Sequence, residues 1–407
     1  AEVTRAQNGR QTILFVDDEA NILAGLGRML RGLRQSMDLQ FAASGEQALA
    51  VLAAQPVDVL VTDMRMPGMD GATLLGLVQE RYPQVIRIML SGQADRDSVL
   101  RTVVTVHQFL TKPTTPETLK EVLTRACALQ DLLADAQLKA LISRLGSLPS
   151  LPALYAELQR RLQDPDCALN DVARIIEQDL GMCAKVLQLV NSSFFGLPRT
   201  IDSPARAVSL LGLDLVRALV LSAGVFTELR PVGRQVLRVE ELQAHSLDVA
   251  RCARLIATAE SGHKEVADNA CIAGMVHDAG KLLLAASLPG EYADVLGLAR
   301  EQGQACWQAE RQVLAADHGL VGGYLLGLWG LPGPVVEAVT LHHRLEDDPE
   351  PSFSPALAVH AADALCHRLR PGTDGLARPE LNTALLERAG LLDRVDRWLA
   401  LCAGAEA

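Results

Sequence analysis

The chain has 407 residues, of which 49% are hydrophobic and 3% aromatic, and it carries a formal net charge of −11. This length predicts two or three domains, and the acidic balance without a lysine or arginine run argues against a nucleic-acid partner. Eight cysteines without CxxC spacing indicate reduced thiols. We find neither a secretory signal pattern nor an apolar run long enough to cross a bilayer. We therefore expect a cytoplasmic protein with no membrane contact.

Polar side chains follow four short apolar runs in the first part of the chain, and each run is a predicted strand. Because the carboxyl ends of parallel strands border the ligand crevice of an open α/β sheet, we expect these side chains to lie together. Carboxylate oxygens suit Mg²⁺, and a lysine can neutralise the charge on a transferred phosphoryl group. The residues at the four strand ends are Asp17 with Asp18, then Asp63, Ser91 and Lys112.

With these groups in this order, residues 11–125 resemble the receiver domain of two-component response regulators. The resemblance implies a doubly wound, flavodoxin-like α/β domain with a five-stranded parallel sheet, and a sensor histidine kinase as partner. It implies that Asp63 accepts the phosphoryl group. The implied Mg²⁺ ligands are Asp17, Asp18, Asp63 and the carbonyl of Arg65. Ser91 and Lys112 are then the residues that contact phosphoryl oxygens, and Phe109 is the aromatic residue that turns inward upon phosphorylation.

A long helix is predicted to leave this first domain. No proline or glycine occurs between Glu117 and Leu145, and apolar residues recur there at three- and four-residue steps. One interpretation is a signalling helix, with 126–146 as the connecting part, that pairs with its copy in a homodimer through residues 117–145. The alternative is a helix packed on its own domain. The apolar residues are Leu119, Val122, Leu123, Ala126, Leu129, Leu133, Ala136 and Ala140.

The remainder of the chain, residues 147–407, reads as helices joined by short breaks, without an alternating strand pattern. Its distinctive segments are Leu148–Pro152, Ile176–Leu180, Leu189–Gly196 and Ala207–Gly212. With these segments, the region from Leu148 to Asp363 resembles the HDOD domain, an all-helical relative of the HD phosphohydrolases. We expect an all-α domain that contains an HD-like subdomain at about 240–370.

Histidines and carboxylates recur along this second region, centred on the dipeptide His277-Asp278. Imidazoles and carboxylates that converge from several helices suit Fe, Mn or Zn. Lys281 lies on the helical face of His277, and Glu241 on the face of His245, so both are catalytic candidates. The resemblance to the HD superfamily implies His245, His277, Asp278 and Asp363 as core metal ligands, with His318, His342 and His343 as additional ligands.

The two resemblances predict a response regulator in which phosphorylated Asp63 controls the HDOD domain. The HDOD domain could be a signalling module that binds a protein or a nucleotide. It could instead be a metal-dependent phosphohydrolase acting on a cyclic dinucleotide or another nucleotide. The complete His/Asp set favours the enzyme, whereas the absence of a Gly-Tyr-Pro signature after Lys281 favours the module. A third interpretation is a receiver whose phosphorylation only sets dimerisation.

Overall fold

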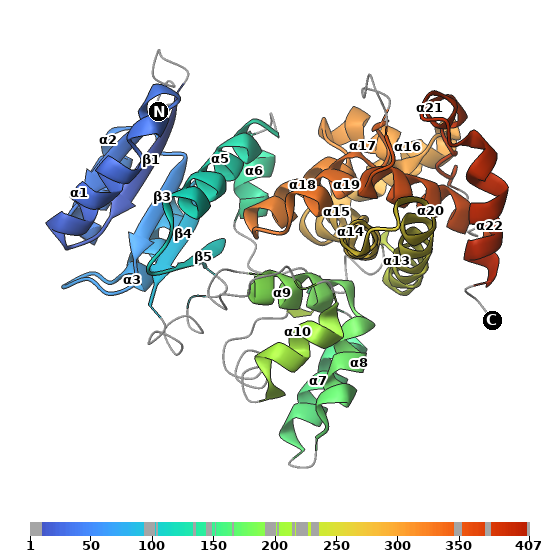
Figure 1. The fold of residues 1–407 in the computed structure, drawn as a ribbon, viewed down its shortest axis with the longest axis horizontal. Helices are drawn as coiled ribbons and strands as arrows, with labels where there is room; N and C mark the ends of the chain where they lie inside the picture. Colours follow the sequence, from blue (N-terminus) through green and yellow to red (C-terminus); the bar gives the residue numbers. More distant parts are fainter. Residues whose placement is uncertain are drawn as a thin grey trace.

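The computed structural model describes residues 10–92, 102, 105–132, 136–143, 149–150, 152–164, 167–191, 201, 203–213, 216, 227–228, 236–345, 352–370 and 376–404. Residues 192–196 of the segment that carries much of the second resemblance lie outside the described part. Figure 1 shows a sheet with its helices in the N-terminal part and a mainly helical assembly in the C-terminal part, with α5 and α6 between them.

The N-terminal domain is built on a parallel sheet in the order β2-β1-β3-β4-β5. Its central strands are buried almost without interruption, as expected when helices cover both faces of a parallel sheet. This confirms the predicted five-stranded parallel sheet. The strands are β1 (Gln11–Val16), β2 (Met37–Ala42), β3 (Val59–Asp63), β4 (Ile86–Ser91) and β5 (Gln108–Thr111), and the helical segments among them are α1 (Ala20–Met29), η1 (Arg31–Gln35), α2 (Gly45–Ala54) and α3 (Gly71–Arg81).

Helix α3 begins directly against the end of β3. A Cβ atom at Gly71 would lie 2.0 Å from the carbonyl oxygen of Asp63, so only glycine permits this approach. Asp70 caps the helix by accepting a hydrogen bond from the Thr73 amide at 2.8 Å. These contacts fix the loop in which Asp63 lies.

The predicted continuous helix over 117–145 is wrong. The structure has two helices instead, α5 (Pro116–Leu132) and α6 (Ala136–Ser143). The Lys139 ammonium donates to the carbonyl oxygen of Gln130. A straight helix would separate these residues by about 13 Å along its axis, so α6 folds back towards α5. No proline or glycine marks the break, which is why the sequence pattern did not reveal it.

The C-terminal region is helical, as predicted, apart from the short parallel pair β6 (Pro149–Ser150) and β7 (Thr227–Glu228), which the sequence pattern did not reveal. None of the described helices is long and apolar enough to span a membrane. The helical segments are α7 (Pro152–Gln163), α8 (Leu169–Glu177), α9 (Leu180–Asn191), α10 (Pro204–Leu211), α13 (Val239–Ser261), α14 (Lys264–Val276), α15 (Ala279–Ser287), α16 (Pro289–Gln302), α17 (Cys306–Leu314), α18 (His318–Leu328), α19 (Gly333–Leu341), α20 (Pro355–Leu369), α21 (Thr383–Arg388), η4 (Leu392–Arg394) and α22 (Val395–Gly404).

Helix α18 lies on the side of the helical assembly next to α5 and α6, and nearly all of it is buried (Figure 1). It packs on α15, α19 and α5. A Cβ at Gly280 would lie 2.0 Å from the His318 carbonyl oxygen, and one at Gly323 would lie 2.0 Å from the Thr340 hydroxyl oxygen. Glycine at these positions therefore lets α15 and α19 approach α18 closely.

Candidate functional site

The N-terminal domain holds a cluster of two acids and a lysine at the carboxyl ends of its strands. The Lys112 ammonium lies 2.9 Å from Asp17 Oδ2 and 2.5 Å from Asp63 Oδ1. Partial burial opposes the charge of Lys112, but the hydrogen bonds and charges of Asp63 and Asp17 outweigh it and raise the lysine pKa. The lysine thus stays charged beside the carboxylate that the sequence singles out.

The other predicted residues of this cluster lie around the same carboxylates. The Arg65 amide donates to Asp63 Oδ2 at 3.1 Å, and Asp18 is exposed beside the buried Asp17. The Ser91 hydroxyl is buried at the end of β4 and has no hydrogen-bond partner among the described residues. An exposed acid, a buried acid and an orphaned hydroxyl fit both a hard cation and a phosphoryl group.

Phe109 is turned inward on β5 and is 4% exposed. Its neighbour Gln108 reaches out of the N-terminal domain and donates from Nε2 to the carbonyl oxygens of Gly327 and Leu328, at 3.2 and 3.1 Å. These carbonyls lie in the last turn of α18, where the helix itself offers no amide to pair with them, and the Gly330 amide beyond the helix donates to the Gly327 carbonyl at 2.9 Å. Strand β5 therefore caps the C-terminal end of α18.

Helix α5 extends this contact between the domains. A Cβ at Gly327 would lie 2.4 Å from Leu129 Cδ2, and Arg125 Nη1 donates to the Leu331 carbonyl at 3.4 Å. Leu119, Leu123, Ala126 and Leu129, part of the predicted apolar stripe, are buried within the single chain. These four residues thus pack within one chain, but Leu129 contacts Gly327 of α18, so the packing is not confined to the helix's own domain as the alternative interpretation has it.

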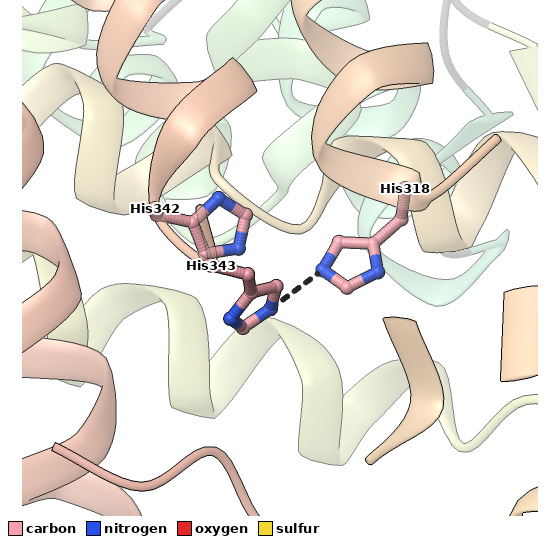
Figure 2. A group of neighbouring side chains, drawn as sticks. All are labelled: His318, His342 and His343. Atoms are coloured by element: carbon pink, nitrogen blue, oxygen red, sulfur yellow. Dashed lines mark hydrogen bonds between the residues drawn. The ribbon is translucent and has the colours of Figure 1, made fainter. Parts of the chain in front are cut away.

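The second cluster contains the predicted metal-ligating residues of the helical domain. Seven side chains come from α13, the α14–α15 junction, α18, the end of α19, and α20. Their candidate ligand atoms form three groups that share residues, and within each group the atoms lie within 4.8 Å of one another. Figure 2 shows the rings of one group turned towards a common space from two helices. The groups are His318 with His342 and His343, His245 with His277 and Asp363, and His277 with Asp278 and His342.

Backbone contacts orient two of the central imidazoles. The Nδ1 atoms of His277 and His342 each lie 2.7 Å from a carbonyl oxygen of their own helix, Gly274 and Val339. An Nδ1–H that donates there leaves Nε2 as a lone-pair donor, and neither Nε2 atom has a hydrogen-bond partner among the described residues. Buried nitrogens with this orientation suit metal coordination.

The electrostatics of the cluster fit a charged Asp278 and a neutral His342. Burial opposes ionisation of Asp278, but the charges of His277 and Lys281 and the hydrogen bond of His318 hold its pKa well below its ordinary range. Burial, followed by the neighbouring imidazoles, lowers the pKa of His342 well below its ordinary value. Deprotonated oxygen and nitrogen ligands are the forms that bind metals.

The two catalytic candidates lie in different surroundings. Lys281 Nζ is 2.8 Å from Asp278 Oδ2, inside the cluster. Glu241 is exposed and lies 2.9 Å from Arg238 Nη1, outside the three ligand groups.

Two further residues of the cluster, Glu310 and His367, were not predicted as site residues from the sequence. Glu310 on α17 is fully buried and accepts from the His318 amide and Nδ1 at 2.6 and 2.7 Å. Burial disfavours a charged His318, but Glu310 outweighs it, and the pKa of His318 rises to about 9. His367 lies 3.3 Å from Asp363 and stacks on His245, with ring centroids 4.1 Å apart. Its spacing of four residues from Asp363 was the available signal, whereas no helical period connects Glu310 to the cluster.

Two family models match the chain. The response regulator receiver domain matches residues 13–124, and the HDOD domain matches residues 148–345. A protein of Treponema pallidum is 25% identical over 287 residues, which cover 70% of this chain and 52% of the relative. The hydrogenase transcriptional regulatory protein HoxA of Cupriavidus necator is 32% identical over 165 residues, covering 39% of this chain and 32% of HoxA. The chain thus spans about half or less of the length of these relatives.

Solved structures are also similar to this chain. The MmoQ response regulator of Methylococcus capsulatus matches with a TM-score of 0.45 and 26% identity, covering 62% of this chain and 98% of MmoQ. An HDOD domain protein of Geobacter sulfurreducens matches with a TM-score of 0.37 and 28% identity, covering 71% of this chain and 94% of that protein.

Proposed function

Because the chain joins a response regulator receiver domain to an HDOD domain, we propose that it is a response regulator in which phosphorylation of Asp63 controls a metal-binding HDOD domain. A sensor histidine kinase is the proposed phosphoryl donor. The observation that carries the proposal is the direct contact of β5 and α5 with α18, whose first residue is His318.

In the receiver, the Asp63 carboxylate is the nucleophile that accepts the phosphoryl group. Lys112 neutralises charge on the transferred group, and the Ser91 hydroxyl donates to one of its oxygens. Asp17, Asp18, Asp63 and the Arg65 carbonyl are the groups that would hold Mg²⁺, which supplies further charge neutralisation when bound. The contacts of Lys112 with both Asp17 and Asp63 support these roles.

Strand β5 links this chemistry to the helical domain. Lys112 directly follows the strand, Phe109 lies inward on it, and Gln108 at its start caps α18. Because Phe109 is inward while Gln108 is bonded to α18, we assign this docked arrangement to the phosphorylated form. Phosphorylation then strengthens the contact of the receiver with α18, and α18 carries the change to His318.

The HDOD domain holds Fe, Mn or Zn in this proposal, through His245, His277, Asp278, His318, His342, His343 and Asp363. The unpartnered Nε2 atoms of His277 and His342 support a metal at this position. A second candidate function, metal-dependent phosphohydrolysis, is favoured by Lys281, whose ammonium borders the cluster and could bind a substrate phosphate. A bound metal would supply Lewis acidity to such a reaction.

A homodimer through residues 117–145 remains a prediction. Since Leu123, Leu129 and their apolar neighbours are buried in one chain, pairing through this stripe would require α5 to leave α18.

Elemental analysis of protein purified without chelators tests the metal centre. We expect at least one Fe, Mn or Zn ion per chain, lost in His277→Ala and in Asp278→Ala because each variant removes a central ligand. The control is His263→Ala, which changes an exposed histidine at the start of α14. A folded wild-type protein without metal would contradict the metal-binding part of the proposal.

A further inference from the structure

A buried carboxylate contacts one of the proposed metal ligands from outside the ligand set. Glu310 on α17 is fully buried, and its Oε2 accepts hydrogen bonds from the backbone amide of His318 at 2.6 Å and from the ring Nδ1 at 2.7 Å. Both bonds go to the same residue. Glu310 therefore holds the backbone and the ring of His318 together.

The second oxygen of Glu310 is held as well. Its Oε1 accepts from the Tyr292 hydroxyl at 3.0 Å and from the Cys306 thiol at 3.4 Å. Tyr292 is itself fully buried on α16, and Cys306 begins α17. Donors on both oxygens are the surroundings that a buried carboxylate anion requires. Because an ionised carboxylate can only accept hydrogen bonds, the proton between Glu310 and the His318 ring lies on Nδ1.

The other edge of the His318 ring faces the ligand cluster. Its Nε2 lies 3.2 Å from Asp278 Oδ1 and 3.1 Å from His343 Nε2, and Figure 2 shows the two rings meeting at these nitrogens. Two nitrogens that bind one ion at about 2.0–2.1 Å lie about 3.0–3.4 Å apart. With one proton fixed on Nδ1, Nε2 is the ring nitrogen of His318 that can take up a metal.

Another helix has to supply this contact, because His318 begins α18. The Nδ1 atoms of His277 and His342 lie 2.7 Å from the carbonyl oxygen of the residue three positions earlier, in the preceding helical turn. The residue three positions before His318 is Ala315, which lies outside α18 and has a φ of 56°. Glu310 thus supplies the acceptor that α18 itself does not offer at this position.

We propose that Glu310 is a positioning residue of the metal centre. It fixes the ring of His318 so that Nε2 points at the cluster, and Tyr292 and Cys306 fix Glu310. This inference rests on the proposed metal-binding function and deepens it, since Glu310 is not one of the proposed ligands. A carboxylate that holds the Nδ1–H of a ligating histidine contributes about 10- to 100-fold to metal affinity.

The test is the affinity of the full chain for Zn²⁺ and Co²⁺, measured in competition with a chromophoric chelator. Glu310→Ala is expected to bind both ions about 10- to 100-fold more weakly. Glu310→Gln keeps one oxygen that can accept from the His318 ring, so it should bind both ions more tightly than Glu310→Ala. Tyr292→Phe removes one donor to Glu310 but keeps the aromatic ring, and it should produce a smaller loss of affinity.

The absorption bands of bound Co²⁺ separate the orientation of the ligand from general stability, because they report the geometry of the ion. The bands should differ between the wild-type chain and Glu310→Ala, whereas Tyr324→Phe should leave both the bands and the affinity unchanged. Tyr324 is the matched control because it is a buried tyrosine of α18 that belongs to none of the ligand groups. Thermal melts of each variant verify its fold.

Unchanged affinity and Co²⁺ bands in folded Glu310→Ala overturn the inference, as do equal losses of affinity in Glu310→Gln and Glu310→Ala. If Glu310→Ala does not fold, wild-type affinity in Tyr292→Phe overturns it. These outcomes leave the metal centre in place, because the wild-type chain still binds metal. A wild-type chain that binds neither ion removes the metal centre itself and, with it, the role of Glu310.

Discussion

Gln108 gives the sharpest perturbation of the contact between the domains. Its side chain donates to two carbonyls at the end of α18, at 3.2 and 3.1 Å, and is almost completely buried. Gln108→Ala removes both hydrogen bonds, so that the Gly327 carbonyl keeps only backbone partners such as the Gly330 amide, at 2.9 Å. The β5 backbone, which pairs with β4, is not altered by this change.

The expected effect follows from the two lost hydrogen bonds. Each contributes a net of about 0.5–1.5 kcal/mol, so the docked arrangement loses about 1–3 kcal/mol. If phosphorylation favours docking, the coupling is reciprocal, and weaker docking must weaken the phosphorylated form. Beryllofluoride, a phosphoryl analogue at Asp63, should therefore bind the variant about 5- to 150-fold more weakly.

Titration of beryllofluoride in the presence of Mg²⁺, followed by tryptophan fluorescence or calorimetry, measures this affinity. Gln55→Ala is the matched control, because Gln55 is a partly exposed residue at the end of α2, away from α18. Unchanged affinity in Gln108→Ala would refute the coupling through β5. Tighter binding would reverse it and assign the docked arrangement to the unphosphorylated form.

Two further predictions concern buried or clustered lysines. Lys112→Ala should slow phosphorylation of Asp63 by acetyl phosphate about 100-fold, because the nearest fixed cation is lost; Mg²⁺ affinity should not fall, and a normal rate would exclude this role of Lys112. Burial lowers the pKa of Lys185 from 10.5 to about 7, so between these values the unfolded chain binds a proton that the folded chain lacks, and stability rises with pH. Lys185→Met removes this penalty but also removes the contact of the Lys185 ammonium with the Trp329 ring. The net free energy of unfolding should therefore rise by about 2–4 kcal/mol at pH 7 and below. The gain should shrink towards pH 10 in thermal melts, and a gain independent of pH would contradict the assignment.

The receiver sheet was predictable because its signals are local. Each strand is an apolar run that ends on a chemically distinct group, and parallel pairing then brings Asp17, Asp63 and Lys112 together. The order of these residues along the chain was therefore enough to predict that they lie together. The candidate metal ligands of the helical domain could also be named from the sequence, since His277-Asp278 and the other histidines follow a recognisable order.

The contacts that depend on docking were not predictable. Helix α6 lies back towards α5 although the sequence between the two helices contains no proline or glycine, so the apolar periodicity predicted one helix. The burial of Leu129 against Gly327 comes from packing between segments far apart in the sequence. Glu310 likewise contacts His318 from a different helix. The helical periodicity of α18 therefore could not reveal this contact.

Control of the HDOD domain through α18 is tested most directly by hydrogen exchange of α18 in the full chain, with and without beryllofluoride. The analogue is expected to slow amide exchange within His318–Leu328, because it strengthens the contact of β5 and α5 with this helix. Asp63→Asn, which cannot form the analogue complex, should show no such change. Protection confined to the receiver, with α18 unchanged, would contradict control of the HDOD domain through this contact.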